Sequence, residues 1–390
     1  MPGKDQATAG KGPLSGVCVV EMAGLGPTPF CGMLLGDMGA DIIRIERVED
    51  AGLGIAIPSA YDLRNRNKRS IALDLKTAQG REALTRLVAR ADVLLEGFRP
   101  GVMERLGFGP ERCLALRPQL VFARATGWGQ DGPLAQRAGH DINYIGLAGA
   151  LGMMGASEGP PSVPLNLVGD YAGGALYMAF GILCALRSAE QSGQGQVIDS
   201  AMIDGVTSLL TVFHGMRQTG ALHPRGENVL DGGAPYYRCY PTQDGGWLAV
   251  GPIESKFYAA FLDRLGLEAA ALPAQNDRAG WSNLEEAIAG RIASGTRAEW
   301  EAAFAGTDAC VSPVLSLDEV PAHPHFQARA MFHAIDGIEH PAPAPRLSRT
   351  PGTVTSNAPR PGEHTAEILR EIGFGDGDIA AGVDARAFAA

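Results

Sequence analysis

The chain has 390 residues, of which 45% are hydrophobic and 19% are charged, and its formal net charge is −10. This composition is ordinary for a folded protein and excludes disorder of the whole chain. The length predicts two domains or one elaborated α/β unit. The acidic balance argues against nucleic acid and membrane surfaces as partners, because phosphate groups attract basic faces.

Six cysteines are scattered along the chain without a C-x-x-C pair, which is typical of reduced thiols. We therefore expect no disulfide and a cytoplasmic location. The start "MPGKDQATAGKGPLSG" lacks the apolar core of a signal peptide, and the ending "AFAA" is not a peroxisomal address. The longest apolar helical run, "ALYMAFGILCAL", is expected to be too short to span a bilayer.

In chain order, strands and helices alternate in the first third of the sequence. Buried strands are predicted at residues 16–23, 41–47, 70–75, 92–98 and 119–127. Helices are predicted between them, at residues 29–40, 76–91 and 100–107. This alternation is typical of an α/β protein with a doubly wound parallel sheet.

The middle and the end of the chain have a different pattern. Helices are predicted from Asp170 to Arg187 and over 200–218, with a further strand at 193–200. Turn residues Asp244, Gly245 and Gly246 predict a hairpin, and the helices after it indicate a second, smaller α+β domain that ends near Cys310. A Pro-rich stretch then leads to a closing helix in "GEHTAEILREIGF".

Three short motifs suggest other chemistries only weakly. "GWGQDG" matches G-x-G-x-x-G, but no acidic residue follows at the spacing that a ribose contact needs. "GASEG" matches a hydrolase elbow around Ser157, but two prolines follow in place of a helix. His323 and His325 lack partners at ligand spacing. We expect neither a nicotinamide dehydrogenase nor a serine hydrolase, and no metal site.

Asp170 opens the apolar run "YAGGALYMAF" and has two interpretations. It serves as a helix N-cap that complements the helix dipole, or it lies beside an anion site made by the free amides of Tyr171, Ala172 and Gly173. Gly173 and Gly174 lower helix propensity and would let a ligand approach closely, which favours the functional interpretation.

His140 follows Gly139 in a loop that is expected at the carboxyl end of a parallel strand, where doubly wound folds bind ligands. One interpretation is that His140 has only a structural role. Histidine is nevertheless the side chain whose ordinary pKa suits it to act as both base and acid near neutrality. We predict that His140 and Asp170 form a two-base pair.

Several long motifs carry a family resemblance from about Leu14 to Phe374. "AGHDINYIGL", "PLNLVGDYAGGALY", "GQGQVIDSAMIDG" and "RGENVLDGGAPYY" resemble α-methylacyl-CoA racemases of the family III CoA-transferase superfamily. The resemblance implies an interlocked homodimer of chains with a Rossmann-like large domain (1–200 and 332–390), a small α+β domain (231–311) and linkers (201–230 and 312–331). The active site would lie between the large domain of one subunit and the small domain of the other.

The same resemblance implies roles for individual residues. His140 and Asp170 would be the acid/base residues on opposite faces of the substrate α-carbon, with Glu254 tuning His140 and Asn166 supporting the site. In family III transferases the aspartate that matches Asp170 instead carries the acyl group, which is the alternative function. Coenzyme A and the thioester would contact Arg47, Asn65, Arg66, Asn67, Lys68, Arg99, Gly139, Asp141, Ile142, Asn143 and Tyr144.

The implied activity is the interconversion of (2R)- and (2S)-2-methylacyl-CoA thioesters. Removal of the α-proton gives an enolate, whose oxygen would be stabilised by the amides of Tyr171, Ala172 and Gly173. No cofactor is expected, since coenzyme A is part of the substrate. The sequence does not name the acyl group: branched fatty acyl, sterol side-chain and arylpropanoyl thioesters all fit. The stretch "GLAGALGMMG" suggests a tolerant acyl surface or, equally, core packing.

Overall fold

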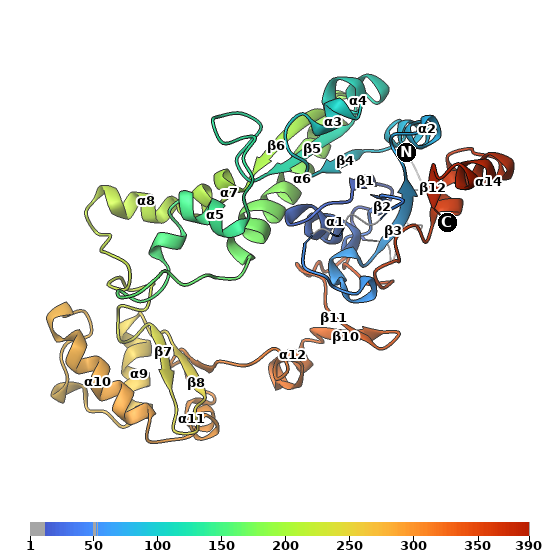
Figure 1. Cartoon of the computed structure of the whole chain (residues 1–390). Helices are drawn as coiled ribbons and strands as arrows, with labels where there is room; N and C mark the ends of the chain where they lie inside the picture. Colours follow the sequence, from blue (N-terminus) through green and yellow to red (C-terminus); the bar gives the residue numbers. More distant parts are fainter. Residues whose placement is uncertain (1–11, 50–51, 53, 390) are drawn as a thin grey trace. The chain divides into compact units, whose positions relative to one another are not determined.

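The computed structural model describes residues 12–49, 52 and 54–389, and these form two compact units. The large unit comprises the described residues of Met1–Ala148, Leu165–Leu209 and Gln327–Ala390. The small unit comprises Gly149–Pro164 and Leu210–Phe326. Figure 1 shows the helices and strands of both units.

A seven-stranded sheet forms the centre of the large unit, in the order β12-β3-β2-β1-β4-β5-β6. Its pairs are parallel except that β12 runs antiparallel to β3. The order β3-β2-β1-β4-β5-β6 is that of a doubly wound Rossmann sheet, so the predicted fold class is confirmed. The strands are β1 (Cys18–Met22), β2 (Asp41–Glu46), β3 (Lys68–Leu73), β4 (Val93–Glu96), β5 (Val121–Thr126), β6 (Gln196–Ala201) and β12 (Phe388–Ala389).

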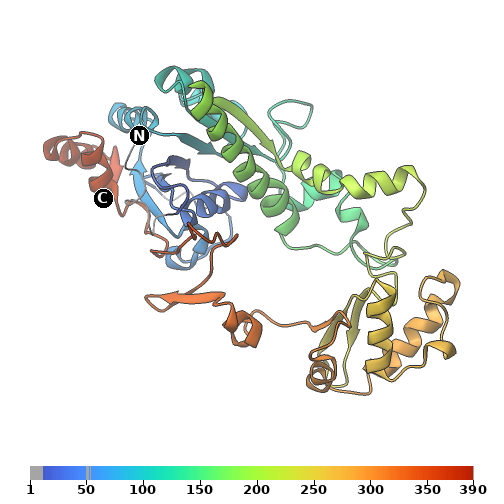
Figure 2. The same ribbon diagram turned by 180° about the vertical axis from the view of Figure 1, so that it is seen from behind.

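Helices cover both faces of this sheet (Figures 1 and 2). One core packs strand residues such as Val20, Ile43 and Phe122 against α2 (Ala78–Val88), α3 (Val102–Arg105), α4 (Pro110–Leu116), α13 (Thr365–Glu371) and α14 (Asp376–Asp384). The other packs the alternate residues, such as Val19 and Ile42, against α1 (Pro27–Asp37) and α6 (Tyr177–Ser192). Burial on two faces explains why the strands are continuous apolar runs.

The small unit contains a three-stranded antiparallel sheet, β7-β8-β9, covered by helices. The strands β7 (Arg238–Pro241) and β8 (Trp247–Val250) form the predicted hairpin, and β9 (Val311–Pro313) pairs with β8. Phe261, Leu284 and Ile288 belong to its core. The helices of this unit include α8 (Thr211–Gln218), α9 (Ser255–Leu265), α10 (Trp281–Ile292) and α11 (Arg297–Phe304), with short 3-10 turns at η3 (Leu151–Met153), η5 (Ala269–Ala271), η6 (Arg278–Gly280) and η7 (Val320–Ala322).

The remaining elements lie at the edges of the large unit or lead to it. They are η1 (Ser59–Tyr61), η2 (Leu63–Asn65), α5 (Asp141–Leu147), the π-helix η4 (Leu167–Leu176), α7 (Met202–Leu209), α12 (Pro324–Ala328), and the hairpin of β10 (Phe332–Ile335) and β11 (Ile338–Pro341).

The compact units divide the chain differently from the expected domains, and two of the differences have a visible cause. The helix α7 was expected in a linker but belongs to the large unit, because its Val206 packs against Gly173 of η4. Residues 149–164 were expected in the large domain but belong to the small unit. Arg225 explains this, since its guanidinium donates to the carbonyls of Ala156 (2.8 Å) and Gly159 (2.7 Å).

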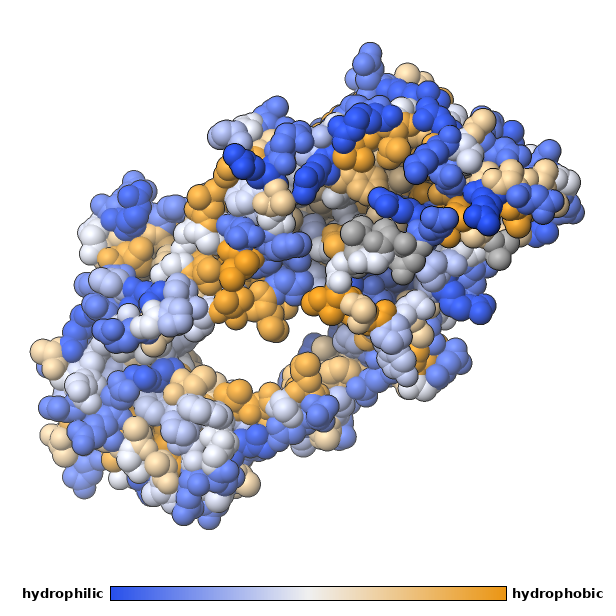
Figure 3. Space-filling model, viewed as in Figure 1, coloured by the Kyte–Doolittle hydropathy of each residue, from blue (hydrophilic) through white to orange (hydrophobic). Residues whose placement is uncertain are grey.

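The apolar helix is longer than the sequence predicted. η4 and α6 are continuous over Leu167–Ser192, 26 residues, which is long and apolar enough to cross a membrane by length and composition. The expectation that it is too short is therefore wrong, because the helix extends beyond the predicted Asp170–Arg187 at both ends. Apolar side chains along it reach the surface, among them Leu176 (50% exposed) and Phe180 (68%). In the view of Figure 3, hydrophobic residues gather at the surface near η4.

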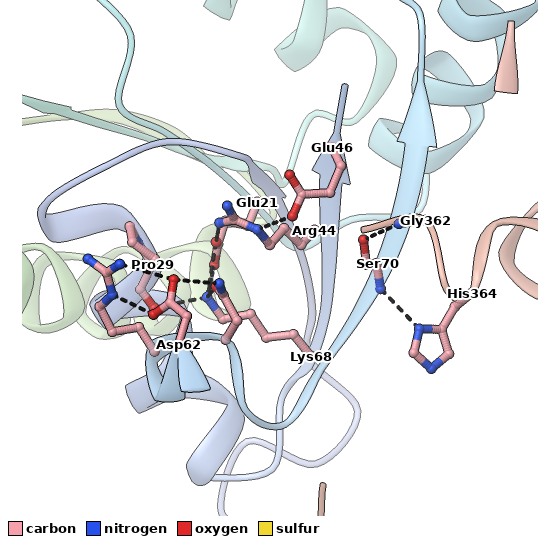
Figure 4. A network of polar contacts seen from close by, with 11 residues as sticks. Glu21, Pro29, Arg44, Glu46, Asp62, Lys68, Ser70, Gly362 and His364 are labelled. Atoms are coloured by element: carbon pink, nitrogen blue, oxygen red, sulfur yellow. Dashed lines mark hydrogen bonds and ion pairs between the residues drawn. The ribbon is translucent and has the colours of Figure 1, made fainter. Parts of the chain in front are cut away.

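Buried ion pairs hold the first three strands and α1 together (Figure 4). Glu21 on β1 accepts from Arg44 Nη1 at 2.6 Å and from Lys68 Nζ at 2.8 Å. Arg66, 2% exposed, binds Asp37 at the end of α1 through two hydrogen bonds of 3.0 and 2.6 Å. Each charge has a partner at close range, which buried charges require.

The C-terminal motif "GEHT" docks on β3 (Figure 4). The Ser70 hydroxyl accepts the Gly362 amide at 2.9 Å, and the Ser70 amide donates to Nδ1 of His364 at 3.2 Å. Thr365 Oγ1 accepts the Ala72 amide at 3.1 Å. These bonds attach the returning chain to the sheet.

Replacement of Arg66 by methionine should lower the free energy of unfolding by about 3–5 kcal/mol, because it leaves the Asp37 carboxylate buried without its partner. Urea unfolding followed by circular dichroism measures this. The control is Arg360→Met, since Arg360 is 82% exposed and lies 3.7 Å from Glu363; we expect a change within about 0.5 kcal/mol. Equal stabilities of the two variants would contradict the prediction.

Candidate active site

The carboxyl ends of the parallel strands place the loops of the candidate site at one edge of the sheet. β1 and β4 are neighbours although β2 and β3 lie between them in the chain, so the strand order reverses here. Doubly wound folds bind ligands at this switch point. The loop from Gly24 to Gly26 follows β1, and the loop with Arg99 follows β4. A Cβ on Gly97 would lie 2.9 Å from Cγ2 of Thr28, so the loop after β4 contacts the first turn of α1.

His140 stands at the N-cap position of α5, and the residue is exposed. Its backbone amide donates to Oδ1 of Asn143 at 3.0 Å, which fixes the start of the helix. Its imidazole is therefore carried on a fixed backbone and remains accessible to a ligand.

Tyr144 anchors this loop from beneath. Its hydroxyl donates to the Gly139 carbonyl, and its ring packs edge-on to Trp128 with centroids 4.8 Å apart. A Cβ on Gly127 would lie 2.0 Å from the Tyr144 ring, so this glycine of "GWGQDG" makes room for an aromatic side chain. Burial, with the charge of Asp170 also contributing, raises the pKa of Tyr144 to about 12.

Asp141 joins the loop of His140 to the helix that carries Asp170. It is 5% exposed, and its Oδ2 accepts the backbone amide of Asp170 at 2.7 Å. Burial raises its pKa, while bonds from the Asp170 and Gly169 amides act in the opposite direction. A Cβ on Gly169 would lie 2.5 Å from Oδ2. Asp141 and Tyr144 were expected to contact substrate; their side chains are buried instead and shape the backbone.

The sequence predicted that the helix carrying Asp170 begins at Asp170, but it begins earlier. It begins at Leu167 as a π-helix with Asn166 at its N-cap position. In a π-helix each amide bonds the carbonyl five residues earlier, so the amides of Tyr171, Ala172 and Gly173 point back into the helix. The interpretation of these three amides as an oxyanion site is wrong for this reason.

The glycines of this helix serve packing. A Cβ on Gly173 would lie 2.7 Å from Cγ2 of Val206, and one on Gly174 would lie 2.9 Å from Cβ of Pro27. Similarly, a Cβ on Gly205 of α7 would lie 1.9 Å from the carbonyl oxygen of Gly173. The close approach that the sequence suggested for a ligand is thus taken by α7 and α1.

The Asp170 carboxyl is partly buried and polarised from several sides. Asn166 Nδ2 donates to its Oδ2 at 3.0 Å, so the supporting residue expected from the sequence makes a direct contact. Burial raises the pKa of Asp170; the Asn166 bond lowers it, the Asp141 charge raises it, and the charges of His140 and Arg64 lower it. His140 and Asp170 are thus close enough to influence each other, and a carboxyl with a raised pKa holds a proton nearer to neutral pH than usual.

Residues 65–68 of the basic segment "LRNRNKRS" (63–70) were expected to contact coenzyme A. Their side chains bind other parts of the protein instead. Arg66 and Lys68 are buried in the ion pairs described above, and Lys68 Nζ also donates to the Pro29 carbonyl at 2.9 Å (Figure 4). Asn65 accepts from Lys68 at 3.2 Å. Asn67 binds the returning chain, since its Oδ1 accepts the amide of Thr355 at 2.7 Å. The side chains of Arg66 and Lys68 therefore hold the fold and do not face solvent.

Two exposed arginines at the strand ends remain as cations toward a ligand, and a third, Arg64, acts on Asp170 from an ion pair. Arg47 after β2 and Arg99 after β4 are exposed. The positive charge of Arg99 lowers the pKa of the Tyr144 phenol and so opposes the increase caused by burial. Arg64 on η2 is bound to Asp62 at 2.7 Å and acts on Asp170. The predicted site residues did not include Arg64, since no local pattern connects η2 to η4.

Glu254 and Ile142 complete the predicted set. Glu254 occupies the N-cap position of α9 in the small unit and is exposed. Ile142 is 43% exposed next to His140. No group of three or more His, Cys, Asp or Glu side chains suited to a metal ion occurs among the residues that the structure describes.

Comparisons with known proteins agree with this architecture. Residues 14–365 match the model of CoA-transferase family III. The chain is 48% identical over 371 residues to an alpha-methylacyl-CoA racemase of Mus musculus, which covers 94% of this chain and 95% of the relative. It is 45% identical to the enzyme of the same name from Homo sapiens, over 94% of this chain and 95% of that one.

A solved structure has the same fold. The crystal structure of a CAIB/BAIF family protein from Brucella suis superposes with a TM-score of 0.81 at 28% sequence identity, covering 93% of this chain and 100% of that one. The sequence match and the shared fold both extend over nearly the whole length, and the chain therefore belongs to CoA-transferase family III.

Proposed function

We propose that this protein is an α-methylacyl-CoA racemase that interconverts (2R)- and (2S)-2-methylacyl-CoA thioesters. One observation carries the proposal: an exposed histidine, His140, lies within electrostatic reach of a carboxyl, Asp170, whose pKa is raised. Two groups of this kind suit the exchange of a proton at a carbon atom. Relatives named as this racemase share nearly half of their residues with the chain.

The reaction is a proton transfer in two steps. The α-hydrogen of a thioester is a weak acid, so the barrier depends on the enolate that forms when it leaves. One of His140 and Asp170 removes the proton, and the other, protonated, returns one to the opposite face. Because the proton comes from the enzyme and solvent, the reaction needs no cofactor beyond the coenzyme A of its substrate. The hydrogen-bond donors to the enolate oxygen are groups other than the amides of Tyr171, Ala172 and Gly173 in η4.

Coenzyme A binds at the carboxyl ends of β2, β1 and β4. Arg47 and Arg99 support this, since both are exposed and follow strands on either side of β1. Their charges give an anionic nucleotide a local attraction that the acidic chain as a whole does not provide.

The protein acts as an interlocked homodimer. The apolar face of the continuous helix formed by η4 and α6 supports this, since Leu176, Phe180 and Leu183 are 45–68% exposed in the single chain. A second copy that covers this face accounts for the length and composition of the helix without a membrane. Glu254 then reaches the active site of the partner, beside that chain's His140.

Incubation of the (2R) or the (2S) epimer of 2-methylbutanoyl-CoA with the protein in D₂O should replace the α-hydrogen by deuterium while the other epimer forms. Proton NMR follows the loss of the α-hydrogen, and chiral chromatography of the hydrolysed acid follows the inversion. Persistence of the α-hydrogen, together with an enzyme-bound acyl group that hydroxylamine releases from Asp170, would identify a family III CoA-transferase instead.

The variants His140→Ala and Asp170→Asn should each lower this exchange about 10²–10⁴-fold, because each removes one of the two proton carriers. His325→Ala is the matched control, since His325 is an exposed histidine of the small unit; its rate should equal that of the wild type. Near-complete turnover by His140→Ala would rule out the two-base mechanism.

Co-expression of His140→Ala and Glu254→Gln chains with different tags tests the shared site. If Glu254 serves the partner's His140, a purified mixed dimer has one complete site and should show about half of the wild-type activity. Both parent dimers should be much less active. A mixed dimer no more active than the average of its parents would show that each site is built from one chain.

A further inference from the structure

The first turn of α1 faces the Asp170 carboxyl without a side chain and without two of its usual amide protons. Gly26 is the N-cap of α1 with φ 67°, and a Cβ there would lie 3.3 Å from Oδ1 and 3.4 Å from Cγ of Asp170. Pro27 and Pro29 follow at the first and third helical positions. The amides of these positions are normally free donors, and proline has none.

The two oxygens of Asp170 are consequently not equivalent. Oδ2 accepts a hydrogen bond from Asn166 Nδ2 at 3.0 Å. Oδ1 faces Gly26, and no hydrogen-bond donor from residues 12–49, 52 or 54–389 is found on it. Oδ1 is therefore the oxygen that is open to a ligand.

Donors on a carboxylate determine how readily it takes up a proton. A carboxylate that accepts amide hydrogen bonds, as at most helix N-termini, has a low pKa because the bonds favour the charged form. Pro27 removes such a donor beside the carboxyl, and its ring instead packs against Gly174 of η4. The first helical position of α1 thus offers no amide donor to Asp170.

We propose that Pro27, which has no amide proton, forms a donor-free wall next to Gly26 and so leaves Oδ1 of Asp170 available to the substrate and able to carry the transferred proton. This inference rests on the proposed racemase function, for which Asp170 must exist in both protonation states. Pro27 acts through Asp170 and is a positioning residue.

Other titratable and charged groups also act on Asp170. His140, Asp141 and the Tyr144 phenol face it from α5 and the residue before it, and Arg64 faces it from η2. The helices packed against η4 contribute Pro27 and Phe30 from α1 and Met202 and Val206 from α7, none of which titrates. Pro27→Ala adds one amide N–H and changes no charge, so a change in titration follows from the new donor.

The test compares kcat/KM for α-hydrogen exchange from about pH 5 to 9 in the wild type and Pro27→Ala. The acid limb of the profile, where Asp170 takes up its proton, should move about one pH unit lower. The basic limb should stay, because the substitution acts on Asp170 alone. At pH 7 the rate should fall about threefold to tenfold, since less of Asp170 is protonated.

Pro110→Ala is the matched control, because Pro110 also starts a helix directly after a glycine, at α4. Its profile should equal that of the wild type. An unmoved acid limb in Pro27→Ala, or an equal shift in Pro110→Ala, would overturn the inference.

A second measurement does not depend on turnover. Water-soluble carbodiimide reacts with protonated carboxyl groups, and peptide mapping quantifies labelling of Asp170 against pH. Labelling of Pro27→Ala should require a pH about one unit lower than labelling of the wild type. Absence of exchange in the wild type would refute the racemase, whereas identical labelling curves would refute the donor-free wall.

Discussion

The hydrogen bond from the Asp170 amide to the Asp141 carboxylate is the interaction on which the arrangement of the site depends. It joins residues 29 apart in the chain at 2.7 Å. Asp141 follows His140 directly, so one side chain fixes the backbone of both candidate catalytic residues. A π-helix leaves one more amide unpaired at its start than an α-helix does. Asp141 satisfies amides of this first turn, and Gly169 leaves the space that its carboxylate needs.

Charge in this protein has two separate uses. Glu21, Arg44 and Lys68 form a buried cluster, and Arg66 pairs with Asp37 out of solvent. Removing such charges from water is favourable only with close partners, which makes these contacts specific ties between β1, β2, β3 and α1. The cations left for an anionic ligand are at the strand ends, where the loops are exposed. A cluster of basic letters in the sequence does not distinguish these uses.

The role of each small residue or proline likewise depends on the group that it contacts. Gly173 and Gly205 let η4 and α7 approach, and Gly127 admits the Tyr144 ring. Gly26 and Pro27 instead face a carboxyl that must remain open. The same loss of helix propensity or of an amide donor is thus structural in one place and chemical in another.

The sequence by itself determined the doubly wound sheet, because alternating apolar runs and amphipathic segments have only a few right-handed arrangements. It also pointed to His140 and Asp170, since ionisable residues in apolar surroundings need a reason, and the family resemblance added Asn166. Tertiary structure alone decided that the helix begins at Leu167, that Arg66 and Lys68 are buried, and that the amides after Asp170 are already bonded. These outcomes depend on contacts between distant segments, such as Asp37 with Arg66 and Asp141 with Asp170, and no local pattern encodes such pairs.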